Sequence, residues 1–288
     1  MTGLERRRRT MAYTLLVPGV LFLLIFFAIP LINQLWVSLM EGNAEDGFEP
    51  QWNWSVYPDS ISKYSDQLLR SVEYAGIATI LCLIIAFPLA YFMAFKAGRF
   101  KNAMLLLVIL PFFTSSLVRT VAWQTIFTDD GWVVHRMQDI GLVSGDGRVL
   151  ATTTAVIAGI TYNFLPFMIL PLYVALEKID RRLIEAATDL HASHFTAFRK
   201  VTVPLAIPGV FAGSLLVFIP ATGDFINAAI LGSPNNLMIG NVVQSKFLTV
   251  LDYPTAAALS FLLMTAILIL IAIFGRLLGT RTLTEAAS

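Results

Sequence analysis

Residue types that commonly carry chemistry are scarce in this sequence of 288 residues. The one cysteine, Cys82, excludes an internal disulfide and any cysteine-based zinc or iron–sulfur site. The three histidines, His135, His191 and His194, argue against a multi-histidine metal centre. No phosphate loop of the form G-x-x-x-x-G-K-[ST] occurs, so ATP hydrolysis would have to take place on another subunit. We therefore predict a non-catalytic protein that binds no cofactor or metal of its own.

The clearest candidate for a ligand-binding charge is Asp224. It follows the apolar segment 201–223 and has no basic residue beside it in sequence. An acidic residue at membrane depth is a functional-site hypothesis by default. We expect its carboxylate to attract a cationic substrate, with the rings of Phe225 and Trp123 offering cation–π surfaces. The alternative is that Asp224 is solvated near the lipid headgroups or caps the turn after it.

Other polar side chains interrupt apolar segments. Tyr162 and Asn163 lie within segment 149–176, where they either line a pore or hold helices together. Arg119 directly follows the charge-free run 102–118. We expect Arg119 to lie near the outer membrane interface, paired with an acidic group or a backbone carbonyl. A cation path is poorly served by an arginine at its narrowest part.

The composition places these residues in a membrane protein. Hydrophobic residues make up 57% of the chain, charged residues only 14%, and the mean hydropathy is +0.73. A soluble domain carries about a quarter charged residues. The net charge of +1 gives no basic field for nucleic acid, so no nucleic-acid partner is expected. We predict an all-α integral membrane fold.

Uncharged runs locate the spans, because a helix needs about 20 apolar residues to cross the hydrocarbon. The run 225–245 is excluded, since its Asn, Gly and Pro residues would leave backbone groups unsatisfied in lipid. There we expect a short helix and a loop, either outside the membrane or packed against a pore. The six predicted spans lie within residues 10–40, 74–95, 102–118, 149–176, 201–223 and 253–275.

Six spans place both termini on one side, and the basic residues indicate which side. With the amino terminus inside, the inner segments hold 14 of the 20 Lys and Arg residues but only six of the 19 Asp and Glu residues. Both termini are therefore predicted to be cytoplasmic, and the first apolar helix is expected to remain uncleaved. The predicted parts are a basic amino-terminal segment (1–10), a transmembrane domain (11–278) and a cytoplasmic tail (279–288).

Two predicted outer loops differ in character. Residues 41–68 are acidic and aromatic, with Trp52, Trp54 and Tyr57 among them. These rings either anchor the loop at the membrane interface or help dock another protein. Residues 127–150 are polar and Gly-rich, and we expect an extracytoplasmic loop there.

The longest inner segment, residues 177–204, predicts a helix–turn–helix on the cytoplasmic face. His191 falls in the predicted turn, Ser193 is a suitable N-cap for the second helix, and Pro204 marks the entry to the next span. An amphipathic helix pair of this kind is a natural docking surface. The apolar stripe of its first helix consists of Ile179, Leu183, Ile184, Ala187 and Leu190.

This segment resembles the EAA loop of ABC-importer permeases, whose pattern is roughly E-A-A-x3-G-x9-I-x-L-P. Because that resemblance implies coupling to an ATPase, we call residues 177–204 the coupling loop. His191 stands where that family has glycine, which takes a positive φ at no cost. Histidine is among the residues enriched at left-handed positions, so the turn is expected to survive. The resemblance assigns coupling to an ATPase to Glu185, Ala186, Ala187, Leu190, His191, Val203 and Pro204.

Four other stretches, at 110–123, 162–173, 220–225 and 231–241, resemble the polyamine (spermidine/putrescine) branch of that family. The resemblance implies a type I ABC-importer permease fold in the inner, cytoplasmic membrane of a prokaryote. It implies an ATPase dimer that binds ATP and Mg²⁺, a second homologous permease as heterodimer partner, and an extracytoplasmic substrate-binding protein. The candidate substrate path is made of Asp224, Phe225, Trp123, Tyr162 and Asn163.

Three alternatives stay open at this point. The same permease fold also serves importers of opines, aminophosphonates, iron and thiamine. A secondary transporter driven by an ion gradient would need acid or histidine relays and paired broken helices, of which only Asp224 gives a hint. The third alternative is a membrane scaffold that recruits an ATPase without transporting anything.

Overall fold

The computed structural model describes residues 14–43, 45–141 and 147–279. The predicted amino-terminal segment 1–10 and residues 280–288 of the predicted tail lie outside this range. The chain divides into two compact units, which are described separately below. One unit holds residues up to Lys63 together with Val243–Leu262, and the other holds Tyr64–Val242 together with the residues from Leu263 onward.

The first unit contains the amino-terminal apolar helix, Thr14–Ser38, and a β-hairpin. Within the helix a π-turn, η1 (Leu24–Ala28), leads into α2 (Ile29–Ser38) directly before Pro30. Proline lacks an N–H donor, and a π-turn is a common local adjustment of the helical ladder. Strands β1 (Met40–Asn43) and β2 (Gly47–Pro50) then pair antiparallel.

Aromatic contacts hold this unit together. The Tyr253 ring lies 5.4 Å from the Phe48 ring and 5.2 Å from the Phe247 ring. The Ser38 and Tyr57 hydroxyls lie 2.8 Å apart. The expectation of one continuous loop over residues 41–68 is wrong, because a helix begins at Val56. Its first turns carry charged side chains, so a search for uncharged runs passes over them.

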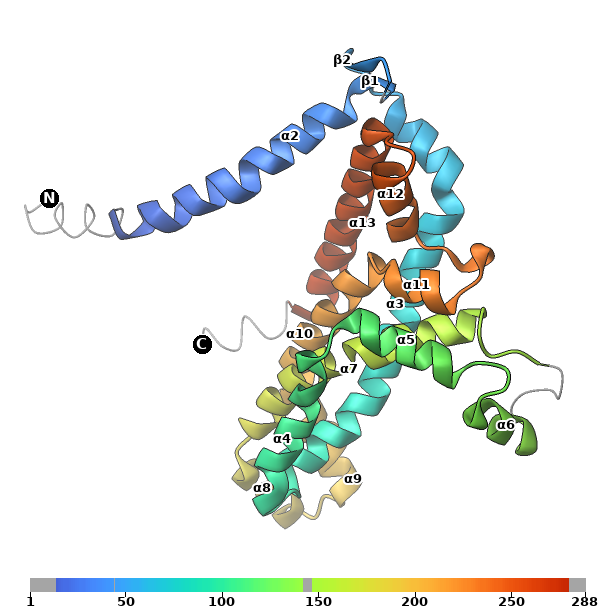
Figure 1. Cartoon of the computed structure of the whole chain (residues 1–288). Coiled ribbons are helices and arrows are strands. Elements are labelled where there is room, and N and C mark those ends of the chain that lie inside the picture. Colours follow the sequence, from blue (N-terminus) through green and yellow to red (C-terminus); the bar gives the residue numbers. More distant parts are fainter. Residues whose placement is uncertain (1–13, 44, 142–146, 280–288) are drawn as a thin grey trace, which may run out of the picture. The chain divides into compact units, whose positions relative to one another are not determined.

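The second unit is almost entirely helical. Helices α3, α12 and α13 each have residues in both units. Its elements in chain order are α3 (Val56–Phe95), η2 (Gly98–Phe100), α4 (Lys101–Ile109), η3 (Leu110–Phe113), α5 (Ser116–Ile126), α6 (Trp132–Asp139), α7 (Thr153–Glu177), α8 (Arg181–Asp189), α9 (His194–Ala197), η4 (Phe198–Thr202), α10 (Val203–Thr222), α11 (Ile226–Leu231), η5 (Pro234–Asn236), α12 (Ile239–Leu248) and α13 (Tyr253–Gly279). In Figure 1, α4, α7 and α10 run toward the end that carries α8 and α9.

The structure supports five to six spans, and it corrects one of the six that were predicted. Five described helices are long and apolar enough to cross a membrane, and a sixth span results when one bent pair is counted as a unit. That pair, 98–113 and 116–126, bends by 94°, so the predicted single helix over 102–118 is wrong. The backbone of Thr114 is extended, and Ser115 precedes the new helix.

The most extensive packing between described elements of the second unit joins α7 and α10. Gly209 and Gly213 on α10 form a G-x-x-x-G pattern, which lets helix backbones approach closely. A Cβ atom at Gly209 would lie 2.5 Å from the Ala175 Cβ and 2.9 Å from the Pro171 carbonyl oxygen. A Cβ atom at Gly213 would lie 2.7 Å from the Met168 sulfur. The two glycines therefore fix how close α10 lies to α7.

The segment 225–245 is broken and packed against other helices, as one of its two predicted alternatives proposed. Asn227, Asn236 and Asn241 are buried in it. The Asn236 amide donates to the Tyr74 hydroxyl at 3.0 Å and to the Thr153 hydroxyl at 2.8 Å. Asn241 satisfies backbone groups of this irregular segment, since its amide donates to the Phe225 carbonyl at 2.7 Å and its Oδ1 accepts the Met238 N–H at 3.0 Å. The predicted loop 127–150 also holds a short helix, α6.

Candidate functional site

Helix α8 of the coupling loop begins and ends on defined caps. The Arg182 backbone N–H donates to the Asp180 side chain at 3.0 Å, which caps the amino end. At the carboxyl end, the N–H of His191 donates to the Thr188 carbonyl and that of Ala192 to the Ala187 carbonyl. With His191 at a φ of 64°, these bonds form a Schellman motif. The left-handed conformation expected at His191 is confirmed.

The second half of the coupling loop joins directly to α10. The Ser193 hydroxyl accepts the Thr196 N–H at 3.2 Å, so the predicted N-cap of α9 is confirmed. A π-turn, η4, follows and continues into α10. The Phe198 ring of this turn contacts the rings of Phe87 and Tyr91 on α3 edge-on, at 5.8 and 5.6 Å. Val203 and Pro204 form the first turn of α10.

A polar contact also fixes the start of the coupling loop to α3. The Arg181 guanidinium donates to the carbonyls of Ala94 and Phe95, at 3.3 and 3.4 Å. These carbonyls lie at the carboxyl end of α3, where a cation is favoured by the helix dipole. Nearby, Lys101 and Glu177 form an ion pair between α4 and α7. The coupling loop is therefore held by side-chain contacts to α3 and α4, and it continues directly into α10.

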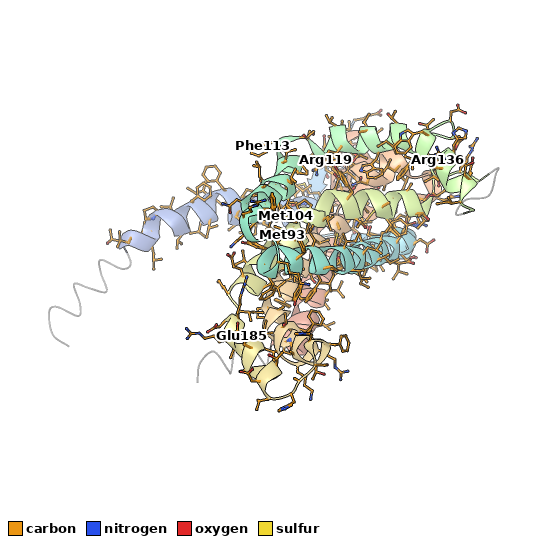
Figure 2. The ribbon with its side chains drawn as sticks, turned by 90° about the horizontal axis from the view of Figure 1, so that it is seen from below. Met93, Met104, Phe113, Arg119, Arg136 and Glu185 are labelled. Atoms are coloured by element: carbon orange, nitrogen blue, oxygen red, sulfur yellow. The ribbon has the colours of Figure 1, made fainter. Side chains whose placement is uncertain are left out.

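Large apolar side chains of the coupling loop face away from this unit. The exposed fractions of Leu183, Leu190 and Phe195 are 50%, 82% and 71%. Glu185 and Ala186 are exposed too, whereas Ala187 is half-buried. Figure 2 shows the Glu185 side chain at a projecting end, well apart from Arg119. An apolar patch with a charged rim on a projecting element has the character of a protein-docking surface.

A second candidate site lies at the bend of the broken span. A cavity of about 590 Å³ opens there between η3, α5, α7 and the turn that links α10 to α11. Two of the predicted path residues besides Asp224 line it, namely Phe225 and Asn163. Its walls combine polar groups with four aromatic rings: Thr114, Ser115, Ser116, Arg119, Asn163, Asp224 and Asn227, with Phe112, Phe164, Phe167 and Phe225.

Asp224 is held in a fixed position in this cavity. Its Oδ1 accepts the Asn227 backbone N–H at 2.8 Å, and its Oδ2 accepts the Asn227 side-chain amide at 2.8 Å. Asp224 therefore caps α11, as the alternative reading of the sequence proposed. The Asn227 Oδ1 accepts in turn from the Thr120 hydroxyl and the Asn163 amide, both at 3.0 Å. The network joins α5, α7 and α11 behind the carboxylate.

The expectation that Arg119 pairs with an acid or a carbonyl is wrong. Its Nε and Nη1 atoms are buried and have no hydrogen-bond partner among the described residues. No ion pair between described side chains joins it to Asp224, although both residues line the same cavity. Each unsatisfied buried donor costs about 1–3 kcal/mol, and more when it is charged. Arg119 faces the cavity because the span bends before it. This bend could not be predicted from the uncharged residues that precede Arg119.

Trp123 and Tyr162 do not line this cavity. Their rings lie 5.2 Å apart, edge to face, and Trp123 also packs 4.9 Å from the Phe127 ring. Tyr162 instead lines a separate apolar cavity of about 300 Å³ between α4 and α7. The pair Tyr162 and Asn163 is thus divided between two cavities, because neighbouring residues of a helix point about 100° apart.

Thr120, Asn227 and three of the four aromatic residues were not among the residues predicted for the substrate path. Asn227 was counted only among the residues that break the segment 225–245. The signal that would have identified it is its position three residues after Asp224, the spacing of a side-chain cap. Phe112, Phe164 and Phe167 have no such signal, since phenylalanine is common in any membrane span.

Comparison with known proteins agrees with this geometry. The family model described as "Binding-protein-dependent transport system inner membrane component" matches residues 86–283. The spermidine/putrescine transport system permease protein PotB of Haemophilus influenzae is 38% identical over 263 residues, covering 88% of this chain and 90% of that protein. PotB of Escherichia coli K12 is 38% identical over 74% of this chain and 78% of its own length. The permease YdcU of the same strain is 34% identical over 74% of this chain and 71% of its own length.

Solved structures show the same fold at low sequence identity. A chain of a bacterial ABC transporter that imports the acidic polysaccharide alginate superposes with a TM-score of 0.68 at 18% identity, covering 96% of this chain and 98% of that one. A chain of the alginate transporter in complex with its pentasaccharide-bound periplasmic protein also gives 0.68, at 16% identity, over 94% and 95%. The predicted all-α permease fold is therefore confirmed.

Proposed function

Because this chain belongs to the family of binding-protein-dependent transport system inner membrane components, we propose that it is the permease subunit of an ATP-driven importer of spermidine, putrescine or a related polyamine. The observation that carries the substrate class is the fixed Asp224 carboxylate in a cavity with four aromatic rings. A carboxylate attracts an ammonium group, and aromatic faces bind cations by cation–π attraction. Similarity to the PotB permeases supports the same substrate.

The exposed apolar residues of the coupling loop support a second part of the proposal. Leu190 and Phe195 are available for insertion into a groove on an ATPase subunit. ATP and Mg²⁺ bind to a dimer of that ATPase, and its closure moves the coupling loop. The π-turn η4 and α10 carry the movement toward the cavity, so the pore alternates between inward- and outward-facing forms.

The remaining partners and the sidedness are part of this proposal. A second, homologous permease completes the pore as a heterodimer, and an extracytoplasmic binding protein delivers the polyamine. The coupling loop and both chain termini face the cytoplasm. The excess of Lys and Arg in the inner segments supports this orientation.

The Arg119 side chain favours a second candidate substrate class. Its guanidinium lines the same cavity as Asp224, and together the two groups offer one site for an amine and one for an acid. An opine or an aminophosphonate carries both groups, whereas a polyamine carries amines alone. Stimulation of ATPase activity by members of one class but not the other separates the two.

The test is substrate-stimulated ATPase activity of the complete complex in lipid, with its binding protein. The panel holds spermidine, putrescine, an opine, an aminophosphonate and a neutral sugar. We expect stimulation by polyamines alone, and we expect Asp224→Asn to raise KM for polyamine about tenfold. The matched control is Asp66→Asn, which removes an exposed carboxylate on a different helix, α3. Stimulation by the sugar or the zwitterions alone would contradict the polyamine assignment and leave the permease assignment in place.

A further inference from the structure

Arg119 is the group in the cavity that a polyamine path does not explain. Its positive charge lies on α5, one residue before Thr120, in the wall that also holds Asp224. Its Nε and Nη1 atoms are buried without a partner among the described residues. A guanidinium carries five N–H donors in a fixed fork, so two buried donors without acceptors leave much of the fork unsatisfied.

Other arginines of the second unit do find carbonyl partners. The Arg70 Nη1 donates to the Leu237 carbonyl at 2.9 Å. The Arg181 Nη2 donates to the carbonyls at the end of α3. Arginine side chains in this unit can therefore find backbone acceptors. The unsatisfied guanidinium is particular to the position of Arg119 at the cavity.

Acceptors without a full set of donors line the same cavity. The Asn163 Oδ1 is buried and has no partner among the described residues. Each Asp224 carboxylate oxygen accepts one hydrogen bond from Asn227, and a carboxylate oxygen has a second lone pair. The cavity thus holds unused donors on Arg119 and unused acceptors on Asp224 and Asn163.

We propose that Arg119 is an internal cation that competes with the polyamine for Asp224. When the cavity is empty, the Arg119 guanidinium turns toward the Asp224 carboxylate and the Asn163 Oδ1. When a polyamine enters, its ammonium group takes this place and the guanidinium withdraws from the carboxylate. This inference rests on the proposed polyamine substrate. In this proposal, Arg119 determines how tightly the polyamine binds and how readily it is released.

The competition has a definite kinetic consequence. An internal cation weakens substrate binding, because the polyamine must displace it from Asp224. The same cation assists release, because it neutralises the carboxylate as the polyamine leaves. Removing the charge of Arg119 should therefore strengthen binding and slow turnover together. A residue that only supports the fold would not couple the two effects in this direction.

The first experiment measures polyamine uptake by the complete complex in proteoliposomes. For Arg119→Gln we expect KM to fall by about fivefold or more, within the usual range of couplings between two sites, with a lower kcat. For Arg119→Lys, which keeps the charge, we expect both constants near those of the wild type. The matched control is Arg70→Gln, an arginine away from the cavity, which should leave KM unchanged. An unchanged or raised KM in Arg119→Gln, at normal complex abundance, would overturn the proposal.

The second experiment needs no substrate. A cysteine is introduced by Phe225→Cys in a Cys82→Ala background, and its labelling rates by a cationic and an anionic methanethiosulfonate are compared. Adding Arg119→Gln should raise the cation-to-anion rate ratio, and adding Asp224→Asn should lower it. With both substitutions the ratio should return toward the starting value. A ratio insensitive to Arg119→Gln would overturn the inference even if polyamine transport is confirmed, whereas a shifted ratio in a complex that transports no polyamine would refute only the substrate.

Discussion

The contact of Gly209 with α7 allows a quantitative prediction. In Gly209→Ala, the new Cβ would lie 2.5 Å from the Ala175 Cβ and 2.9 Å from the Pro171 carbonyl oxygen. Carbon atoms in favourable contact are about 3.5–4.0 Å apart, so α10 and α7 must move apart. Overpacking of this kind costs about 1–3 kcal/mol.

A matched glycine isolates this packing cost from helix propensity. Replacing a glycine by alanine within a helix stabilises it by about 1 kcal/mol. Gly76 lies within α3 and has no neighbouring atom within 4 Å of its ideal Cβ position, so Gly76→Ala should gain this amount. The free energies of unfolding of Gly209→Ala and Gly76→Ala should therefore differ by about the full packing cost of 1–3 kcal/mol. Gly213→Ala should lie between them, since its closest contact is the flexible Met168 sulfur.

The assay is thermal and denaturant unfolding of the purified complex in one detergent, with all three variants measured side by side. We expect the order of stability Gly76→Ala, then Gly213→Ala, then Gly209→Ala. Adding Ala175→Gly to Gly209→Ala should restore part of the loss, because the Pro171 carbonyl still crowds the new methyl group. The reasoning is refuted if Gly209→Ala is as stable as Gly76→Ala.

Three further predictions concern the coupling loop and the buried amides. His191→Gly should retain substrate-stimulated ATPase activity, whereas His191→Val should lower stability by about 1–2 kcal/mol, because a β-branched residue is strained at the observed φ of 64°; unfolding and ATPase assays on both variants check this. Leu190→Asp should change the unfolding free energy of the permease by less than about 0.5 kcal/mol, since the side chain is 82% exposed, yet weaken its capture by the ATPase subunit in a pull-down. Asn236→Leu should destabilise the complex by about 2–3 kcal/mol, because the Tyr74 and Thr153 hydroxyls lose their amide donor; an unchanged melting temperature would contradict the role of this network.

Much of the fold could be predicted because the membrane imposes simple rules. Uncharged runs indicated six spans, and amides with glycines and a proline excluded the segment 225–245. The turn of the coupling loop was also predictable, because capping depends on local sequence. Ser193 caps α9, and His191 adopts the left-handed conformation.

The rest depended on contacts between distant segments. The bend after Phe113 falls inside an uncharged run, so composition alone gives a straight helix there. This bend brings Arg119 to the wall of the cavity. Trp123 was expected beside Asp224, yet its ring packs against Tyr162 on another helix. Distances between side chains of different helices are set by packing, which a single sequence does not display.

The π-turn η4 has a mechanical consequence for the coupling loop. A π-turn holds one residue more than an α-turn, so tightening it to α geometry shifts the register by one residue. Such a shift rotates the preceding segment by about 100° and advances it by about 1.5 Å along the helix axis. We therefore expect the junction between the coupling loop and α10 to allow the loop to rotate by this step. The close packing of Gly209 and Gly213 against α7 should keep α10 itself in place during such a rotation.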